Sequence, residues 1–307
     1  MKIIYRLISE LFLIVSPLII LYRILKGKES RYRFFERYAI KSCQRDSGKL
    51  IWFHCSSVGE LLSIVPIVER LEANSKIKQI LITTTTLSSS KIFESLNLKK
   101  SIHQFLPIDN KFLINKFVNY WKPSIFFLCE SEIWPHLIEK IKESKIKLIL
   151  INGRMTKKSF KRWKKIKRFS IKIFEKFDLC LVQNFETQKR LKILGVKKIL
   201  NLGNLKFTTS KKIKKELLQK SFINYFKNKE ILLTAASTHF DEENFVIKNH
   251  LYFSNKNKNI ISIIVPRHIE RTNDIKKEIE KYSLKTHLHS SRKKIGPKVD
   301  IYIVDTY

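Results

Sequence analysis

The stretch "IWFHCSSVGELLSIVP", residues 51–66, decides the fold. An apolar run ends in small polar residues, and Gly59 and Glu60 then precede apolar residues that recur at helical spacing. This pattern predicts a buried strand that turns directly into a helix. An ionised carboxylate in the first turn faces the positive end of the helix dipole, which lowers its pKa. Glu60 is therefore either a functional carboxylate at a strand end or an ordinary first-turn residue that the dipole favours.

Further apolar runs alternate with periodic, helix-like segments on the C-terminal side of this stretch. The predicted strands of this part are residues 50–55, 77–85, 103–107, 124–129, 146–153, 179–184 and 196–207. Continuous apolar strands that alternate with helices are typical of βαβ units and a parallel sheet covered on both faces. The same pattern resumes at residues 231–237, 261–268 and 299–307.

The composition divides the chain into four segments. We expect an α/β protein with a membrane anchor at 1–28, a Rossmann-like domain at 29–207, a basic polar linker at 208–228 and a second, partial Rossmann-like domain at 229–307. The second domain is expected to be incomplete, because no helix follows its last predicted strand.

The N-terminal segment contains a nearly continuous apolar run from Leu11 to Tyr22, flanked by Lys and Arg. A full membrane span needs about 20 apolar residues, and Glu10 and Pro17 interrupt this run. The segment therefore predicts either a short signal-anchor or a helix lying in the membrane interface. A buried core helix is the alternative.

The charge balance points to anionic partners. The chain has 61 Lys and Arg against 27 Asp and Glu, a formal net charge of +34, although general enrichment in Lys accounts for that total equally well. Basic residues interleave with aromatic residues at 155–177, which predicts either a helix on an anionic membrane or an ordinary surface helix. The chain has no RRM, KH or helix-turn-helix signature, which argues against nucleic acid as a partner. It has no C-x-x-C pair, and no glycine-rich dinucleotide or P-loop motif either.

Polar residues at the predicted strand ends are the candidate site, because ligands of open parallel sheets bind beyond the carboxyl ends of the strands. Carboxylate pairs suit acid–base work, and Arg suits phosphate or carboxylate ligands. Each candidate has a plain alternative as a solvated loop or strand-end residue. The candidates are Thr84, Glu130, Glu132, Asn152 and Arg154 in the first domain, and Ser237, Thr238, His239 and Arg267 in the second.

Eight short motifs occur in a fixed order. They are "SSVGE", "ITTTT", "LPIDN", "CESEIWP", "INGRM" followed by "KSF", "LGNLKF", "AASTH" and "VPRH". In this order they resemble the bacterial Kdo transferases, which move 3-deoxy-D-manno-octulosonic acid (Kdo) from CMP-Kdo to the lipid A precursor, lipid IVA. The resemblance runs from about residue 1 to the last residue.

The resemblance implies a GT-B architecture, in which the first domain binds the lipid acceptor and the second binds the CMP-sugar. It implies an inverting glycosyltransferase of lipopolysaccharide biosynthesis that needs no metal and no cofactor beyond its donor substrate. It also implies attachment to the cytoplasmic face of the inner membrane, where anionic lipid would attract the basic residues, and no role for nucleic acid.

Motif matching also implies residue roles. Glu60 would be the general base, Glu130 and Lys206 would stabilise the transition state, and Pro266 and Arg267 would contact CMP. The matching motifs add Ser57, Gly59 and His268 to the substrate-binding candidates.

Three departures from the family pattern stand out. Asp241 occupies the Gly position of the family's Ser-Thr-His-x-Gly-Glu-Glu motif, and Ile269 stands where Pro usually follows "PRH". The chain stops at "DTY", before the family's Gly-rich nucleotide-binding segment. The sequence thus resembles a Kdo transferase that lacks its C-terminal part, and the alternatives are an inactive fragment or a non-enzymatic, basic membrane-surface binding protein.

Overall fold

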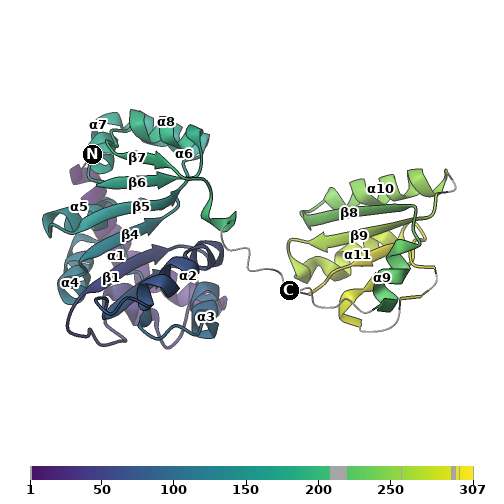
Figure 1. Cartoon of the computed structure of the whole chain (residues 1–307), viewed down its shortest axis with the longest axis horizontal. Coiled ribbons are helices and arrows are strands. Elements are labelled where there is room, and N and C mark those ends of the chain that lie inside the picture. Colours follow the sequence, from purple (N-terminus) through teal and green to yellow (C-terminus); the bar gives the residue numbers. More distant parts are fainter. Residues whose placement is uncertain (1, 208–219, 257, 292–294, 297, 307) are drawn as a thin grey trace. The chain divides into compact units, whose positions relative to one another are not determined.

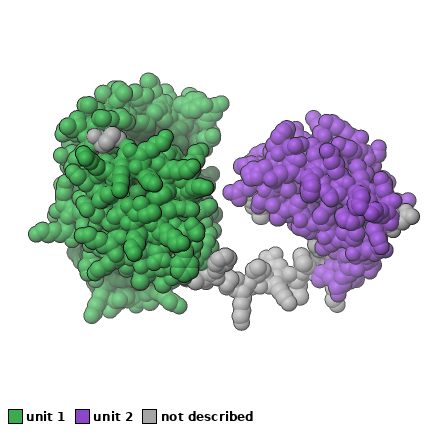
Figure 2. Space-filling view, turned by 90° about the horizontal axis from the view of Figure 1, so that it is seen from above, with its two compact units in different colours: residues 1–210 green, residues 211–307 purple. Residues whose placement is uncertain are grey.

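The structure, a computed structural model, describes residues 2–207, 220–256, 258–291, 295–296 and 298–306. The chain forms two compact units, unit 1 (residues 1–210) and unit 2 (residues 211–307), which are coloured separately in Figure 2. Residues 208–219 of the predicted linker lie outside the described residues. Residues 220–227 of that linker form a helix of unit 2.

Unit 1 is built on a seven-stranded parallel sheet with the order β3-β2-β1-β4-β5-β6-β7 (Figure 1). Its strands are β1 (Leu50–Cys55), β2 (Gln79–Thr84), β3 (Ser101–Phe105), β4 (Ile125–Cys129), β5 (Lys147–Gly153), β6 (Leu179–Val182) and β7 (Ile199–Asn201). Because all strands are parallel, their carboxyl ends lie along one edge of the sheet.

Helices connect these strands and cover the sheet. They are α1 (Lys2–Leu25), α2 (Val58–Glu72), α3 (Leu87–Ser95), α4 (Lys111–Trp121), α5 (Pro135–Glu143), α6 (Lys157–Lys165), α7 (Lys167–Phe174) and α8 (Phe185–Ile193), with short 3-10 turns η1 (Phe34–Tyr38) and η2 (Leu205–Phe207).

Both faces of the sheet are buried, as the continuous apolar runs predict. Leu50 and Trp52 of β1 pack in one apolar cluster with α4, α5 and α7, whereas Ile51 and Phe53 pack in a second cluster with α2 and α3. Successive side chains of a strand point to opposite faces, so a strand buried on both faces must be apolar throughout. The predicted α/β fold with a doubly wound parallel sheet is therefore confirmed.

Helix α1 lies along the face of unit 1 that carries α4, α5 and α7 and is drawn in purple behind the sheet in Figure 1. Its contacts with the rest of the unit run along its whole length. Lys2 pairs with Glu139, Tyr5 donates to Asp109 (2.6 Å), Ser9 bonds His136 (3.1 Å), Ser16 bonds Tyr38 (3.1 Å) and Arg23 pairs with Glu29. The buried face of α1 is thus unusually polar. By length and composition, α1 could also cross a membrane.

Unit 2 has a four-stranded parallel sheet with the order β10-β11-β9-β8. Its elements are α9 (Lys220–Lys227), β8 (Ile231–Thr238), α10 (Glu242–Ser254), β9 (Ile260–Pro266), η3 (Ile269–Arg271), α11 (Thr272–Glu280), β10 (Thr286–Leu288), η4 (His289–Ser291) and β11 (Ile301–Ile303). Strand β10 is absent from the sequence-based prediction, because three half-buried residues give no apolar run.

The basic segment 155–177 forms two helices rather than the one that its spacing predicts. Helices α6 and α7 meet at Ile166, whose ψ of 41° is not helical. The buried Ser170 hydroxyl donates to the carbonyls of Trp163 and Ile166, and this bond holds the two helices at the break. Phe160, Trp163 and Phe169 are partly buried and pack against the core, whereas most Lys and Arg side chains of the segment are exposed.

Candidate functional site

Glu60 lies at the turn from β1 into α2, and its carboxylate is held from two sides. The Ser56 amide donates to Oε2 (2.8 Å) and the Ser57 hydroxyl donates to Oε1 (3.2 Å), while Ser57 caps the helix by accepting from the Glu60 amide (3.3 Å). The sequence folds this way because Ser at the cap and Glu three residues later satisfy the free amides of the first turn. Glu60 is only 7% exposed, and these hydrogen bonds hold its side chain in one rotamer.

The pKa of Glu60 is raised to about 7, mainly because burial disfavours the charged form. The negative charges of Glu130 and Glu132 add to this effect, and the bonds from Ser56 and Ser57 oppose it. This outcome differs from the dipole effect alone, which would lower the pKa. A carboxylate that titrates near neutrality can both accept and release a proton under ordinary conditions.

Glu130 follows β4 and forms an ion pair with Lys206, with 2.8 Å between Oε1 and Nζ. Asn152, at the end of β5, joins the two segments through its side chain. Its Nδ2 donates to Glu130 (3.4 Å), and its Oδ1 accepts from the Leu205 backbone amide (3.1 Å). The pair is thus held by a buried side chain that contacts both partners' segments.

The backbone at this point lies in a region that L-residues rarely adopt. Glu130 has a φ of 54° and Asn152 a φ of 52°. A non-glycine residue in this conformation costs about 1–3 kcal/mol, and such strain clusters at functional sites. The Glu130 amide bonds the Ile151 carbonyl (3.0 Å) and its carbonyl accepts from the Arg154 amide (3.2 Å), so the strained turn remains fully hydrogen-bonded.

Lys206 also lies close to the start of α2. A β-carbon built on Gly59 would lie 3.6 Å from Lys206 Nζ, so the ammonium group reaches the turn that carries Glu60. Three parts of the chain that are distant in sequence, the turn after β1, the turn after β4 and η2, therefore form one cluster of charge. The sequence-based expectation that Glu60, Glu130 and Lys206 act together is compatible with this arrangement.

Glu132 faces the same cluster from the loop before α5. Trp134 Nε1 donates to its Oε2 (3.2 Å), and His54 Nε2 lies 3.6 Å from the same oxygen. Burial raises the pKa of Glu132, but the His54, Ser56 and Trp134 side chains outweigh it and hold the pKa below its usual value. The pKa values of Glu60 and Glu132 are therefore shifted in opposite directions by their surroundings.

His54 is a site residue that sequence reasoning missed. It lies within the apolar β1 and is 0% exposed, so nothing in the sequence separates it from a core residue. Its Nδ1 faces Thr83, and among the described residues its Nε2 has no hydrogen-bond partner. This nitrogen is closed to solvent and faces Glu132 Oε2 at 3.6 Å, so His54 acts on the site through Glu132.

The threonine run after β2 has a different arrangement from the one expected. The Thr84 hydroxyl is buried and bonds His103 Nε2 (2.9 Å), so it serves the core between β2 and β3. Thr85 instead donates to the Ser56 carbonyl (2.7 Å) and supports the turn that carries Glu60. Arg154, by contrast, is exposed beyond β5.

The second-domain candidates lie at the adjacent ends of β8 and β9. Thr238 pairs with Pro266 in the sheet, and the Arg267 amide donates to the Thr238 carbonyl (3.0 Å). The Thr238 hydroxyl is buried and donates to Glu243 (2.8 Å), which Arg271 also binds (3.0 Å). This network fixes the two strand ends.

The remaining candidates of unit 2 are exposed at this edge. Ser237, His239, Arg267 and His268 are all accessible, and the rings of His239 and His268 lie 6.3 Å apart. Exposed imidazole and guanidinium groups at strand ends suit an anionic ligand. Pro266 itself is buried at the end of β9.

Metal-binding groups and cysteines also bear on the chemistry of the site. Within the described ranges, no group of three or more His, Cys, Asp or Glu residues is placed to hold a metal ion. The Cys55 and Cys129 sulfurs lie 3.2 Å apart beneath the carboxylates, but both are buried. Burial raises the pKa of Cys55 well above its usual value, so it is not an activated nucleophile.

The sequence is similar to known proteins along most of its length. The family model described as 3-deoxy-D-manno-octulosonic-acid transferase (kdotransferase) matches residues 31–209. The chain is 35% identical to the 3-deoxy-D-manno-octulosonic acid transferase of Rickettsia bellii, over 99% of this chain and 72% of that protein. It is 32% identical to the enzyme of the same name from Haemophilus influenzae, over 86% of this chain and 64% of that protein.

A similar fold occurs among solved structures. UDP-GlcNAc 2-epimerase from Neisseria meningitidis, solved with UDP-GlcNAc, matches with a TM-score of 0.56 over 84% of this chain and 72% of that one, at 13% identity. At this identity the match shows the fold alone, which is GT-B-like. The resemblance inferred from the eight motifs is confirmed by the family model and the relatives.

Proposed function

Because the chain belongs to the 3-deoxy-D-manno-octulosonic acid transferase family, we propose that it transfers Kdo from CMP-Kdo to the lipid A precursor, lipid IVA, with Glu60 as the general base. Kdo transfer in lipopolysaccharide biosynthesis is the function of the family. What we propose in addition is the identity of the donor, the acceptor and the general base. The observation that carries it is a rigidly held, buried carboxylate with a pKa of about 7 at the turn after β1.

In the proposed reaction, a hydroxyl of the acceptor attacks the anomeric carbon of Kdo. The new bond forms from the hydroxyl oxygen to that carbon as the bond from the carbon to the phosphate oxygen breaks, and CMP leaves with the electron pair. Attack from the side opposite the phosphate inverts the configuration. Glu60 takes the hydroxyl proton, for which the Ser56 and Ser57 bonds keep its carboxylate in place.

Glu130 and Lys206 are proposed to stabilise charge in the transition state. Lys206 Nζ lies within this carboxylate cluster, 2.8 Å from Glu130 Oε1, and the pairing holds it in place. A preorganised cation is worth most where negative charge develops, here on the Kdo carboxylate or the departing phosphate. No metal ion and no cofactor other than the donor are needed for these steps.

Substrate binding is assigned to the remaining site residues. In unit 1 we assign the acceptor sugar to Ser57, Gly59, Thr84, Glu132, Asn152 and Arg154, with Thr84 acting only through its neighbour Thr85. In unit 2 we assign CMP to Ser237, Thr238, His239, Pro266, Arg267 and His268. The exposed Arg267 supports this, because a guanidinium group suits a phosphate.

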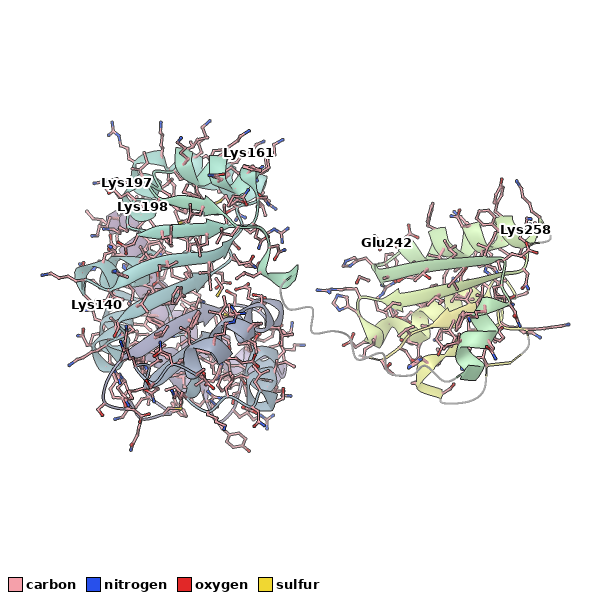
Figure 3. All side chains as sticks on the ribbon, viewed as in Figure 1. Lys140, Lys161, Lys197, Lys198, Glu242 and Lys258 are labelled. Atoms are coloured by element: carbon pink, nitrogen blue, oxygen red, sulfur yellow. The ribbon has the colours of Figure 1, made fainter. Side chains whose placement is uncertain are left out.

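Attachment to the cytoplasmic face of the inner membrane is part of the proposal. Helix α1 supplies apolar contact, and the exposed basic side chains of α6 supply attraction to anionic lipid. Lys161 of α6 and Lys197 and Lys198 before β7 point outward from unit 1 (Figure 3). Each Lys or Arg near such a surface contributes about 1 kcal/mol. Since the aromatic face of α6 packs inward, this helix would act by charge and not by insertion.

The test is incubation of the full chain with CMP-Kdo and lipid IVA, with mass spectrometry of the lipid product. We expect the mass of the lipid to rise by that of a Kdo residue, which is Kdo less one water. Glu60→Gln should lower the rate by about 10² to 10⁴. The matched control is Glu69→Gln, an exposed residue of the same helix, which should keep the wild-type rate. Turnover by Glu60→Gln close to that of wild type would refute the assignment of the base. Vesicle binding without any turnover would favour the non-enzymatic membrane-surface protein instead.

A further inference from the structure

A cavity lies between α1 and the loops at the carboxyl ends of β2 and β3. Its volume is about 450 Å³, within the range of ~300–1,000 Å³ typical of ligand sites. One wall is α1, including Ile8, Phe12 and Ile19, and the opposite wall includes Leu106 and Ile108. We call this space the α1 cavity. Most of its lining is apolar, so an occupant must be apolar as well.

The α1 cavity adjoins the carboxylate cluster through two shared residues. Thr85 lines the cavity and donates to the Ser56 carbonyl, and the Ser56 amide holds Glu60. Trp134 also lines the cavity, and its indole nitrogen donates to Glu132. An occupant of the cavity would therefore lie next to the turn that holds the general base.

The cavity is also continuous with the exposed apolar side of α1. Ile8 and Phe12 line it and are nevertheless 59% and 46% exposed, so they belong to both surfaces. Arg23, Arg37 and Glu29 line the part near the end of α1, where two guanidinium groups share one carboxylate, whereas Asp109, bonded to Tyr5, lines the part near its start. An apolar channel with a cationic end suits an anionic amphiphile rather than a neutral hydrocarbon.

We propose that the α1 cavity binds a hydrocarbon chain of the lipid acceptor and thereby places the acceptor sugar beside Glu60. The proposal rests on the proposed function, because it assumes that the acceptor is a lipid. Its occupant is one acyl chain of the acceptor, which leaves the membrane along the exposed side of α1. Helix α1 then has a role in substrate binding in addition to any role in attachment.

The first test uses the wild-type chain and water-soluble acceptor analogues, each with one acyl chain, in a series of increasing length below the micelle concentration. Each buried methylene should raise kcat/KM about fourfold until the cavity is filled, after which the value should level off. Transfer with the same kcat/KM at every length would overturn the chain site and leave the proposed function intact. If no analogue accepted Kdo, not even the deacylated sugar, the proposed function itself would fail.

The second test compares neighbouring positions of α1. Ile19→Trp fills the cavity from a half-buried position, whereas Leu18→Trp lies on the exposed side of the helix and is the matched control. We expect Ile19→Trp to abolish the dependence on chain length and to keep the rate with the deacylated sugar, and Leu18→Trp to behave as wild type. Ile108→Trp fills the cavity from the opposite wall and should reproduce the effect if Ile19→Trp folds poorly. An unchanged chain-length dependence in a folded cavity-filling variant would refute the proposal.

A readout independent of turnover uses Trp134 in the cavity wall. An acceptor analogue with a brominated chain should quench tryptophan fluorescence in the wild type and quench it less in Trp134→Phe. Equal quenching in both proteins would place the chain elsewhere. Quenching by a brominated phospholipid but not by the acceptor would identify the cavity as a site for membrane lipid and would also overturn the proposal.

Discussion

Lys206 Nζ lies 2.8 Å from Glu130 Oε1, and this contact joins the segment after β7 to the end of β4. The lysine side chain is 44% exposed, so the pair contributes little to stability, about 0–1 kcal/mol. In the proposed function, Lys206 lies beside the turn of Glu60 to stabilise charge in the transition state. Loss of this contact should therefore lower the rate of the reaction far more than the stability of the fold.

Lys206→Met should therefore lower kcat/KM by about 10² to 10³, the usual loss for one preorganised charge-stabilising group, with little change in melting temperature. Lys91→Met, which removes an exposed lysine of α3, should leave kcat/KM unchanged. Both variants are compared by Kdo transfer and thermal unfolding. A Lys206→Met enzyme with wild-type kcat/KM would show that the ion pair has no part in catalysis.

The pH dependence of the rate should report Glu60. Its pKa is about 7, and only the ionised form accepts a proton from the acceptor hydroxyl. We expect log kcat/KM to rise with a slope of one below that pH and to reach a plateau above it. The Glu69→Gln control should have the same profile. A rate that stays constant through neutral pH would mean that Glu60 is not the group that titrates.

The same raised pKa predicts a stability change of known sign. The folded value of about 7 lies above the ordinary value of 4.5, so folding favours the protonated carboxyl. This contribution is fully present below pH 4.5 and is lost as pH rises through 7. Glutamine stays neutral throughout, so Glu60→Gln should gain melting temperature relative to wild type as pH rises across this window. A difference between the two proteins that does not vary with pH would contradict the burial effect.

The sequence predicts the strands well, because each central strand is buried on both faces and reads as one apolar run. It predicts Glu60, Glu130 and Glu132 as candidates, because they lie in the turns that follow such runs. It cannot predict that Glu130 meets Lys206, since that contact depends on how β4 and β7 are ordered in the sheet. It also cannot distinguish Thr84 from Thr85, whose side chains have different partners at the end of β2.

Asp241 illustrates a departure from the family pattern that the structure explains. It occupies the family's Gly position and has a φ of 74°, in the region that favours glycine. Its side chain does not cap α10; among the described residues it accepts a hydrogen bond from Asn244 (2.8 Å). Asp241→Gly should therefore be more stable than Asp241→Ala by about 1 kcal/mol, because both lose the Asn244 bond but only alanine is strained.

The measurement for Asp241 is urea unfolding of the two variants. Unfolding is monitored in unit 2, for example by hydrogen exchange of the α10 amides. Comparing glycine with alanine removes the effect of the lost carboxylate from the result. Alanine equal to or more stable than glycine would mean that the turn before α10 relaxes out of the left-handed region.

The contacts of α1 predict how this helix meets a membrane. Its exposed side carries a row of large apolar residues, Ile3, Ile4, Leu7, Ile8, Leu11, Phe12, Ile14, Val15, Leu18, Leu21, Tyr22 and Leu25. Its other side bonds unit 1 from Lys2 at one end to Arg23 at the other. A helix that crosses a bilayer must carry one end through about 30 Å of hydrocarbon, away from the domain on the near side. Both ends of α1 are held against unit 1, which favours a helix lying flat in the interface.

We therefore expect both ends of α1 to be accessible from the side of the membrane where unit 1 lies. Single cysteines at Lys2 and Leu25, placed in a Cys43→Ser background because the other three cysteines are buried, test this on vesicle-bound protein. A membrane-impermeant thiol reagent added outside should label both positions to the same extent before the vesicles are lysed. If one of the two positions were labelled only after lysis, α1 would span the bilayer. Its bonds to Glu139 and Asp109 would then have to break when the protein binds the membrane.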